Sequence, residues 1–306
     1  MPAPVRTAAA SLRVLLDGMI DYAGLFPPAS LDMKTCVQNC RRYRNTPEQW
    51  ALGRFVLPVG RLDEFLIARR DAPLDRWRLS GIVSTDIATD LSAVEEFNRK
   101  ASNAVMDSLE VRVRCKEDIL LAAQHLPPGA MAFFEIAPER AAELLPVVRE
   151  VGGSAKLRTG GVVAEAFPTV EQIAGFIAVC AELGVPFKAT AGLHHPMRSV
   201  RPLTYEPDSR AERMHGFLNL FTSAAIAWSA ARAGRDAGRT TLATCLADEE
   251  RANWHFDEDA LTWSGENEPR RMDLKALRAT RTEFALSFGS CSFEEPLADL
   301  HELDLL

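Results

Sequence analysis

The sequence predicts a single (β/α)8 barrel. Short runs typical of strands alternate with amphipathic runs typical of helices along the whole 306-residue chain, and no Gly-, Ser- or Pro-rich linker divides it. Parallel strands need helical crossovers, and eight right-handed crossovers close a barrel of about 250 residues. The alternative is an open doubly wound sheet. The turn after the first strand, residues 24–28, lacks the Gly-rich phosphate-binding pattern of that fold.

Eight strands are predicted, each bounded by turn-forming or charged residues. They cover residues 19–23, 54–59, 80–86, 108–114, 131–137, 155–160, 186–191 and 283–288. Amphipathic periodicity predicts the helices that follow the first six strands. These cover residues 31–44, 62–69, 91–100, 116–125, 138–151 and 169–183.

The extra length lies between the seventh and eighth strands, in an insertion over about residues 197–282 of a single domain 1–306. Its predicted parts are a long helix 214–233, a second helical run from Arg239, a hairpin 254–263 and a short helix 274–280. We interpret this insertion as a cap or as a contact between subunits. It therefore favours a homo-oligomer.

Composition excludes several classes of function. The chain has 35 Lys and Arg against 42 Asp and Glu, a formal net charge of −7, which argues against nucleic acid or an anionic membrane as a general partner. The longest apolar stretches, such as residues 217–231, are shorter than the roughly 18 residues of a membrane span. Charged residues interrupt the N-terminal apolar stretch, and the six cysteines are scattered without a CxxC pair. We therefore expect a cytoplasmic protein with reduced, mostly buried thiols.

Charged residues occur in the predicted strands at alternating positions, where a barrel normally has Val, Ile and Leu. Because alternate residues of a strand point to opposite sides, these side chains are predicted to face the lumen. They are Glu110, Arg112, Arg114, Glu135, Lys156, Arg158 and Lys188, with Thr190 on the same face as Lys188. This set has a surplus of positive charge, which predicts a small anionic substrate with a phosphate or carboxylate group. The alternative is a structural layer of ion pairs, such as Glu110 with Arg112 and Glu135 with Lys156.

Lys156 and Lys188 lie on adjacent predicted strands, so their side chains are expected to approach each other in the lumen. At an effective dielectric near 20, a like charge about 7 Å away costs about 2 kcal/mol, enough to lower a lysine pKa by more than one unit. A lysine that is neutral at pH 7 can attack a carbonyl carbon and form a Schiff base.

Three short segments resemble the deoxyribose-phosphate aldolase family. Residues 156–160 (Lys-Leu-Arg-Thr-Gly) and 188–192 (Lys-Ala-Thr-Ala-Gly) resemble its paired lysine strands, and residues 288–292 (Phe-Gly-Ser-Cys-Ser) are similar to the turn after its last strand. The resemblance implies a (β/α)8 barrel in which Lys156 forms the Schiff base, Lys188 perturbs it and Glu110 relays protons. It further implies that Gly289, Ser290 and Ser292 help to hold a substrate phosphate. Arg158 replaces a small polar residue of that family, so a keto acid is as plausible a substrate as a sugar phosphate.

Histidines follow the seventh strand at the end of the barrel where such sites lie. His194 and His195 are adjacent, and His215 begins the long helix. One of the pair contacts substrate in our first interpretation. In the alternative it joins His215 with Glu135 or Asp86 around a zinc or manganese ion. Asp21, at the end of the first strand, is a candidate proton carrier, or else caps a helix or pairs with an arginine in the lumen.

The sequence therefore favours a Schiff-base lyase or aldolase that acts on a small anionic carbonyl compound and needs no cofactor. Lys156 is its predicted nucleophile, and Lys188 with Glu110 or Glu135 moves protons. Arg158, Arg112, Thr190, His194, His195, Asp21, Gly289, Ser290 and Ser292 are the predicted substrate-binding residues. A metal-dependent lyase or isomerase and a non-catalytic anion-binding barrel remain the alternatives.

Overall fold

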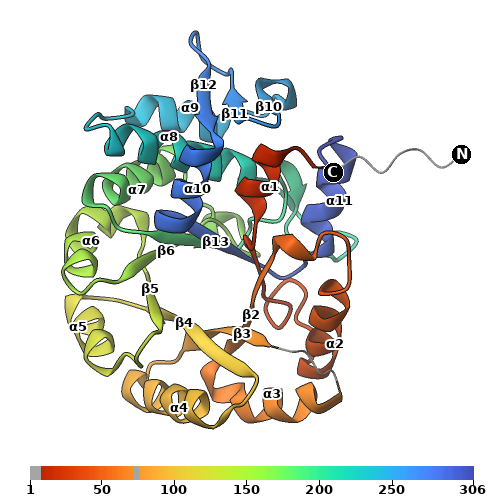
Figure 1. Cartoon of the computed structure of the whole chain (residues 1–306), viewed down its shortest axis with the longest axis vertical. Helices are drawn as coiled ribbons and strands as arrows, with labels where there is room; N and C mark the ends of the chain where they lie inside the picture. Colours follow the sequence, from red (N-terminus) through yellow and green to blue (C-terminus); the bar gives the residue numbers. More distant parts are fainter. Residues whose placement is uncertain (1–7, 72–75) are drawn as a thin grey trace, which may run out of the picture.

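The computed structural model describes residues 8–71 and 76–306, and eight parallel strands close a barrel at its centre (Figure 1). Strands that follow one another in the chain are neighbours, and the last strand closes the barrel against the first. The strands are β1 (Ile20–Tyr22), β2 (Leu52–Pro58), β3 (Trp77–Val83), β4 (Ala104–Arg112), β5 (Met131–Glu135), β6 (Ser154–Arg158), β7 (Phe187–Thr190) and β13 (Ala285–Ser290). The predicted (β/α)8 fold is confirmed, and each predicted strand overlaps an observed one.

Helices surround the barrel, and one follows each of the first six strands (Figure 1). These are α2 (Met33–Tyr43), α3 (Leu62–Ala68), α4 (Ile87–Lys100), α5 (Lys116–His125), α6 (Ala141–Glu150) and α7 (Val170–Leu183). A helix that the sequence did not predict, α1 (Ala10–Leu16), precedes the first strand, and α11 (Glu294–Glu302) follows the last.

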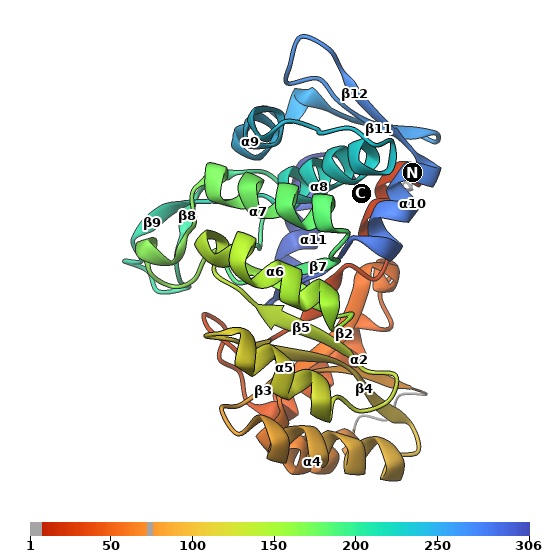
Figure 2. The same cartoon turned by 90° about the vertical axis from the view of Figure 1, so that its left-hand side faces the viewer.

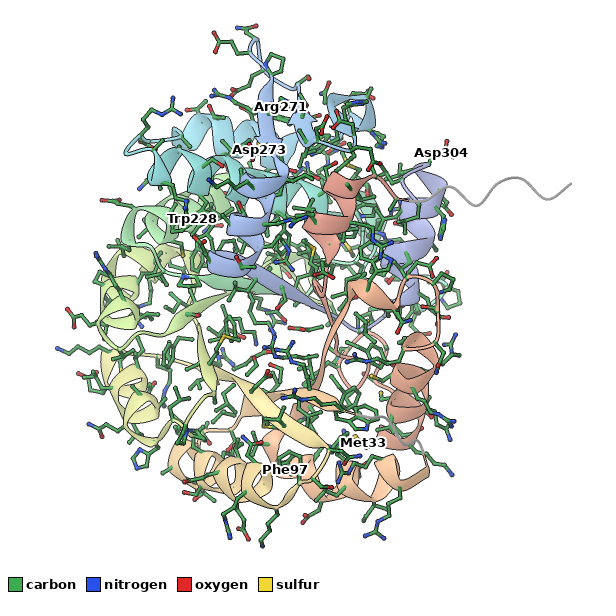
Figure 3. All side chains as sticks on the ribbon, viewed as in Figure 1. Met33, Phe97, Trp228, Arg271, Asp273 and Asp304 are labelled. Atoms are coloured by element: carbon green, nitrogen blue, oxygen red, sulfur yellow. The ribbon has the colours of Figure 1, made fainter. Side chains whose placement is uncertain are left out.

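Helix ends carry the local signals that their sequences suggest. Thr169 and Gln172 form a capping box at the start of α7, and Gly184 ends that helix in the left-handed conformation (φ 65°). The carboxylate of Asp273, labelled in Figure 3, accepts the backbone N–H of Ala276 at the start of the helix that precedes β13. These caps satisfy backbone groups that would otherwise lack partners.

The strands separate two environments, because successive side chains point to opposite faces. Residues on the outer face pack against the helices and are fully buried, as Leu57, Leu109 and Leu157 show. Side chains fill the space between the strands and the surrounding helices (Figure 3). The inner face carries polar side chains such as Ser80 and Glu110. The main apolar core therefore lies between strands and helices, and the lumen holds the buried charged groups of the barrel.

The segment between β7 and β13 contains the predicted helices and hairpin and additional elements. In chain order these are β8 (Ser199–Pro202), β9 (Ala211–Met214), α8 (Phe217–Arg232), α9 (Arg239–Ala247), β10 (Trp254–Phe256), β11 (Ala260–Trp263), β12 (Arg270–Asp273) and α10 (Leu274–Glu283). Figure 2 shows the β8–β9 hairpin projecting to one side, and β11 and β12 beyond α8. The predicted hairpin 254–263 is confirmed, with Trp254 paired to Trp263, whereas β12 and the β8–β9 hairpin were not predicted.

Helix α8 contributes to the core of the barrel. Trp228 stacks on Phe284, with ring centroids 4.9 Å apart, and Phe217 stacks on Phe288 of β13 at 5.1 Å. The apolar face of α8 is therefore covered within this chain. Its composition consequently lends no support to the predicted subunit contact.

All six cysteines are free, and five of them are buried, as expected. The stretch Ala164–Leu183 is long and apolar enough to cross a membrane by length and composition, a feature that the sequence analysis did not note. In the structure this stretch is interrupted before α7, and α7 buries Ile173, Phe176 and Ile177 in the core. The apolar side chains of this stretch thus pack α7 against the barrel.

Candidate active site

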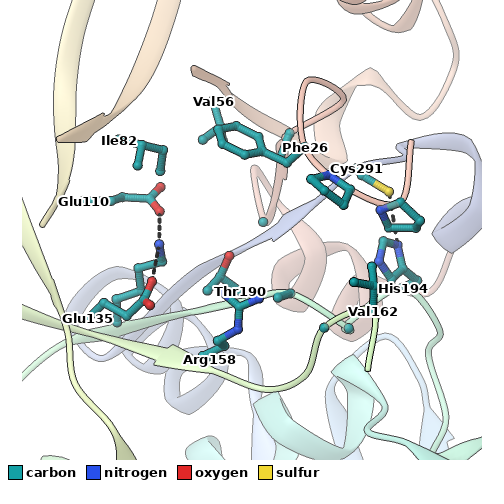
Figure 4. Close-up of a pocket in the computed structure, with 18 of the residues that line it drawn as sticks. Phe26, Val56, Ile82, Glu110, Glu135, Arg158, Val162, Thr190, His194 and Cys291 are labelled. Carbon is teal, nitrogen blue, oxygen red and sulfur yellow. Dashed lines mark hydrogen bonds and ion pairs between the residues drawn. The ribbon is translucent and has the colours of Figure 1, made fainter. Parts of the chain in front are cut away.

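A cavity of about 310 Å³ opens at the C-terminal ends of the barrel strands (Figure 4). Glu110, Glu135 and Lys156 contribute its charged floor. Its walls are largely apolar and come from the loop after β1, from β2 and β3, from the loop after β6, and from the β8–β9 hairpin. The apolar wall residues include Phe26, Pro27, Pro28, Val56, Ile82, Val162, Leu203 and Met214.

Five charged side chains form a continuous chain of ion pairs in the lumen. The Lys156 ammonium lies 2.8 Å from Glu110 Oε2 and 2.8 Å from Glu135 Oε2. The Lys188 ammonium lies 2.7 Å from Glu110 Oε1 and 2.7 Å from Asp21 Oδ2. Glu110 therefore bridges the two lysines, with one carboxylate oxygen on each.

The strands determine this arrangement through their register. Lys156 pairs with Lys188 across β6 and β7, and Glu135 pairs with Lys156 across β5 and β6. Ser80 supports the bridge, since its hydroxyl donates to Glu110 Oε1 at 2.7 Å. On the other side, Asp21 accepts the backbone N–H of Arg54 at 2.7 Å. Asp21 thus neither caps a helix nor pairs with an arginine side chain, and it is fully buried outside the cavity lining.

The charge balance predicted from the sequence is wrong. Three carboxylates (Asp21, Glu110 and Glu135) meet two lysines in the described lumen, so no cationic surplus exists around Lys156. Burial by itself lowers the pKa of Lys156, but Glu110 and Glu135 outweigh it and hold that pKa above its usual value. Burial likewise raises the pKa of Glu110, yet the two lysines lower it overall. Lys156 is consequently protonated in this state, contrary to the expectation of a neutral amine.

The two lysines differ in their access to the cavity. Lys156 borders it, whereas Lys188 does not belong to its lining and is 1% exposed. The Lys188 ammonium lies over the ring of Phe133, 5.4 Å from its centroid. Only Lys156 of this pair is therefore placed to meet a molecule bound in the cavity.

The loops after β6 and β7 are tied together at the cavity mouth. The Thr159 hydroxyl donates to the carbonyl of Ala191 at 2.7 Å, and the Thr159 amide donates to the carbonyl of Thr190 at 2.9 Å. Gly192 has φ +66°, and a Cβ there would lie 2.9 Å from the Cα of Gly160. The glycines of both sequence segments thus allow the two loops to approach closely.

Arginines lie beside the floor rather than within it. Arg158 lines the cavity, is exposed, and donates from Nε to the carbonyl of Gly160 at 3.0 Å. Arg112 is exposed in a neighbouring depression that Arg158 and Glu135 also line. Arg114 lines the same depression but not the cavity, and it pairs with Asp118. The predicted inward direction is wrong for Arg114, because β4 ends at Arg112 and strand alternation no longer applies beyond it. Arg112 is in register with Glu135 and lies at the exposed end of its strand.

The turn after β13 is arranged differently from a phosphate loop. Gly289 lines the cavity, but the hydroxyl of Ser290 donates to the carbonyl of Ser292 at 2.6 Å. The backbone N–H of Ser292 in turn donates to Ser290 Oγ at 3.3 Å, and Ser292 Oγ accepts the N–H of Glu295. The hydroxyls of Ser290 and Ser292 therefore have partners within the turn, and Ser290 Oγ also lies 3.2 Å from His194 Nδ1. Only Gly289 of the three predicted residues lines the cavity.

Cys291 lies between these serines and lines the cavity together with His194. His194 Nδ1 is 4.0 Å from Cys291 Sγ and 3.3 Å from Glu295 Oε2, and the hydroxyl of Tyr205 lies 3.1 Å from Glu295 Oε2. Of these residues, only His194 was predicted from the sequence as a site residue; Cys291, Glu295 and Tyr205 were not. Cys291 lies between β13 and α11, and Glu295 follows it by four residues in the first turn of α11, a spacing visible in the sequence. Tyr205 comes from the unpredicted β8–β9 hairpin.

The histidines do not converge. His195 Nδ1 pairs with Asp299 at 2.6 Å, and neither residue lines the cavity. His215 Nε2 lies 2.7 Å from the carbonyl of Pro168. In residues 8–71 and 76–306, no group of three or more His, Cys, Asp or Glu side chains is arranged to hold a metal ion. The hypothesis in which His194 or His195 shares an ion with His215 therefore lacks its predicted ligand set here.

The chain was compared with known proteins. No family model and no curated protein matches it. Among solved structures, it is similar to the deoxyribose phosphate aldolase from Aeropyrum pernix, described as a unique tetrameric structure. The two are 14% identical with a TM-score of 0.41, and the match covers 60% of this chain and 80% of that one. At this distance the fold assignment rests on the strand order of the present chain.

Proposed function

We propose that the protein is a Schiff-base lyase or aldolase acting on a small anionic carbonyl compound, with Lys156 as the nucleophile. The observation that carries this proposal is the position of the Lys156 ammonium. It lies at the floor of a cavity, 2.8 Å from each of two carboxylates that can accept its proton. Lys188, which does not border the cavity, keeps Glu110 in place from the opposite side.

A bound carbonyl compound starts the reaction by displacing water around Lys156. Proton transfer from the ammonium to Glu110 or Glu135 then produces a neutral amine beside a neutral carboxylic acid. In a water-poor cavity this neutral pair is less unfavourable relative to the ion pair than it is in bulk water. The amine attacks the carbonyl carbon, and the carbonyl oxygen leaves as water with one proton from the amine and one from the carboxylic acid, which becomes a carboxylate again. The protonated imine then accepts the electrons of the breaking C–C bond.

The charges around the cavity favour one orientation of an anionic substrate. Neither Arg158 nor Arg112 has an ion-pair partner within the described residues, and both lie near Glu135 at the ends of β6 and β4. Glu295, by contrast, lies beside the turn after β13. A carboxylate or phosphate is therefore expected near Arg158 and Arg112 rather than at Ser290 and Ser292. Thr190, which also lines the cavity, is the adjacent hydroxyl donor.

Reduction with cyanoborohydride tests the proposal. The protein is incubated with a panel of acetaldehyde, glyceraldehyde 3-phosphate, pyruvate and glyoxylate, reduced, digested and examined by mass spectrometry. We expect a covalent adduct on the peptide that contains Lys156, and none on that peptide in the Lys156→Met variant. Lys116, which is exposed, reports non-specific imine formation in the same sample. An adduct on Lys156 no more abundant than on Lys116 across the panel contradicts the proposal.

The homo-oligomer, the single-domain organisation and the cytoplasmic location expected from the sequence remain part of this proposal. Sedimentation of the purified protein measures the first of them directly.

A further inference from the structure

A second group of reactive side chains lies at the cavity wall formed by the turn after β13. Cys291 Sγ is 4.0 Å from His194 Nδ1 and 3.6 Å from the Tyr205 hydroxyl. His194 Nδ1 also faces Glu295 Oε2 at 3.3 Å and Ser290 Oγ at 3.2 Å. The imidazole thus lies between the thiol and the carboxylate and contacts both, and both the thiol and the imidazole line the cavity that contains Lys156 (Figure 4).

Charge sets the protonation states of this group. Burial by itself lowers the pKa of His194, but hydrogen bonds to Cys291 and Glu295 outweigh it and raise that pKa to about 9. Burial by itself raises the pKa of the Cys291 thiol, but His194 outweighs it and lowers that pKa. The other buried thiols show the opposite result, since burial raises the pKa of Cys36 to about 11 and that of Cys40 to about 12.

We propose that Cys291, His194 and Glu295 form a second nucleophilic site, which adds reversibly to a small aldehyde at the end of the cavity opposite Lys156. The thiolate sulfur forms a bond to the aldehyde carbon while the C=O π bond opens. The oxygen takes the Nδ1 proton of His194, which gives a neutral hemithioacetal. Reversal returns the proton to His194 and releases the aldehyde, so the step needs no oxidant, reductant or other reactant.

An aldehyde fits this wall better than an ester or an anion. A hemithioacetal needs one proton donor and no leaving group, and His194 is that donor. Glu295 disfavours an anionic ligand next to the thiolate, while Phe26, Pro28 and Leu203 supply apolar surface for a short alkyl chain. The inference rests on the proposed lyase function only for the origin of the aldehyde, which would be the fragment released when a C–C bond breaks at Lys156.

Rates of alkylation by iodoacetamide test the site, with propanal as the aldehyde. Each cysteine peptide is quantified by mass spectrometry at pH 7, in the wild-type protein and in the Lys156→Met variant. Cys115 is the internal control, because it is more exposed than Cys291. We expect Cys291 to react about tenfold faster than Cys115, because the thiolate is the reactive form and His194 lowers the pKa of Cys291. Propanal should slow the alkylation of Cys291 and leave Cys115 unchanged, in both proteins.

Variants separate charge from accessibility. His194→Asn removes the proton donor and should bring the Cys291 rate down to that of Cys115 or below, and Glu295→Gln should shift it in the same direction by a smaller factor. A Cys291 that reacts no faster than Cys115 in the wild-type protein overturns the proposal, as does propanal that protects both cysteines equally. The proposal is also overturned if propanal protects Cys291 from alkylation in the wild-type protein but not in Lys156→Met. Protection that persists without any imine on Lys156 instead overturns the lyase function and leaves the thiol site standing.

Discussion

The floor of the cavity and its wall at the end of β13 hold two nucleophiles in opposite states. On the floor, two carboxylates surround the Lys156 amine and keep it protonated. On the wall, an imidazole lies beside the Cys291 thiol and favours its deprotonated form. Both groups line the same cavity, and both are more than nine-tenths buried.

The difference shows that the sign of the neighbouring charge, rather than burial, decides the state of each group. Burial alone would make both groups neutral. A partner of opposite charge instead shifts the pKa of each group towards its charged form, upward for Lys156 and downward for Cys291. The floor therefore needs a proton transfer before it can react, and the wall does not.

The largest expected effect comes from Glu110→Gln. This change removes the carboxylate that both lysines contact and leaves two buried ammoniums around a neutral amide. We expect the free energy of unfolding at pH 7 to fall by about 3–5 kcal/mol, the cost typical of breaking a buried ion pair by removing one partner. The pKa of Lys156 should fall as well, so the nucleophile on the floor, like Cys291 on the wall, would have a lowered pKa. Chemical denaturation and the pH dependence of Lys156 acylation measure the two effects.

The same variant has a predictable pH dependence. The folded state holds the pKa of Glu110 below its usual value of 4.5, so Glu110 contributes stability above that pH and loses its contribution as the pH falls through the lower folded-state pKa. The difference between wild type and Glu110→Gln should therefore shrink in acid. Glu139→Gln, at an exposed position outside the cavity, is the matched control. A loss below about 1 kcal/mol at pH 7 would contradict the bridging role.

Two histidines extend the comparison, because their pKa values shift in opposite directions. Burial lowers the pKa of His215 to about 4, whereas the pKa of His194 is raised to about 9. His215 thus stabilises the fold above pH 6.5, and about 3 kcal/mol is lost as the pH falls from 6.5 to 4. His194 contributes below pH 6.5 and loses its contribution as the pH rises towards 9.

Unfolding curves between pH 4.5 and 9 check these signs. His215→Asn should flatten the acid side of the stability profile, and His194→Asn the alkaline side. If both variants flatten the same limb of the stability profile, then contact with Glu295 does not raise the pKa of His194.

A smaller effect is expected from Arg158→Met. If the anion of the substrate lies on the floor side, the variant should need about tenfold more glyoxylate for half-maximal imine trapping, which corresponds to about 1.4 kcal/mol. Trapping of neutral acetaldehyde should not change. Arg114→Met, which alters an arginine outside the cavity, is the control. Equal losses for glyoxylate and acetaldehyde would remove Arg158 from the recognition of the anion.

The smallest expected effect is that of Tyr205→Phe. The Tyr205 hydroxyl contacts Glu295 and Cys291, but the side chain is 58% exposed, so its hydrogen bonds contribute about 0.5 kcal/mol. Alkylation of Cys291 at pH 7 should slow by about twofold. A loss as large as that of His194→Asn would mean that the tyrosine, and not the imidazole, maintains the thiolate.

The fold could be predicted from the sequence because its signals are local. Each barrel strand is a short run bounded by turn residues, and the alternation of side chains correctly placed Glu110, Lys156 and Lys188 in the lumen. Alternation failed for Arg114, which lies beyond the end of β4, and the β8–β9 hairpin has too few apolar residues to be recognised as strands.

The charge balance of the site could not be predicted, because it depends on closure of the barrel. Asp21 reaches Lys188 only because β1 pairs with β13 and β13 pairs with β7. That contact joins residues 167 positions apart in the chain. In the same way, the environment of Cys291 combines a loop after β7, the β8–β9 hairpin and α11, three elements that local patterns do not connect.

The two ion pairs of Lys156 limit what its nitrogen can donate once it becomes part of an imine. An ammonium has three N–H groups and can donate to Glu110 and Glu135 together, as it does here. An iminium on the same nitrogen keeps the positive charge but has a single N–H, so it can donate to only one of them. The net charge of the lumen is thus unchanged, while either Glu110 or Glu135 loses the N–H donor that it had from Lys156. Covalent capture would itself unmask a Brønsted base next to the captured carbon.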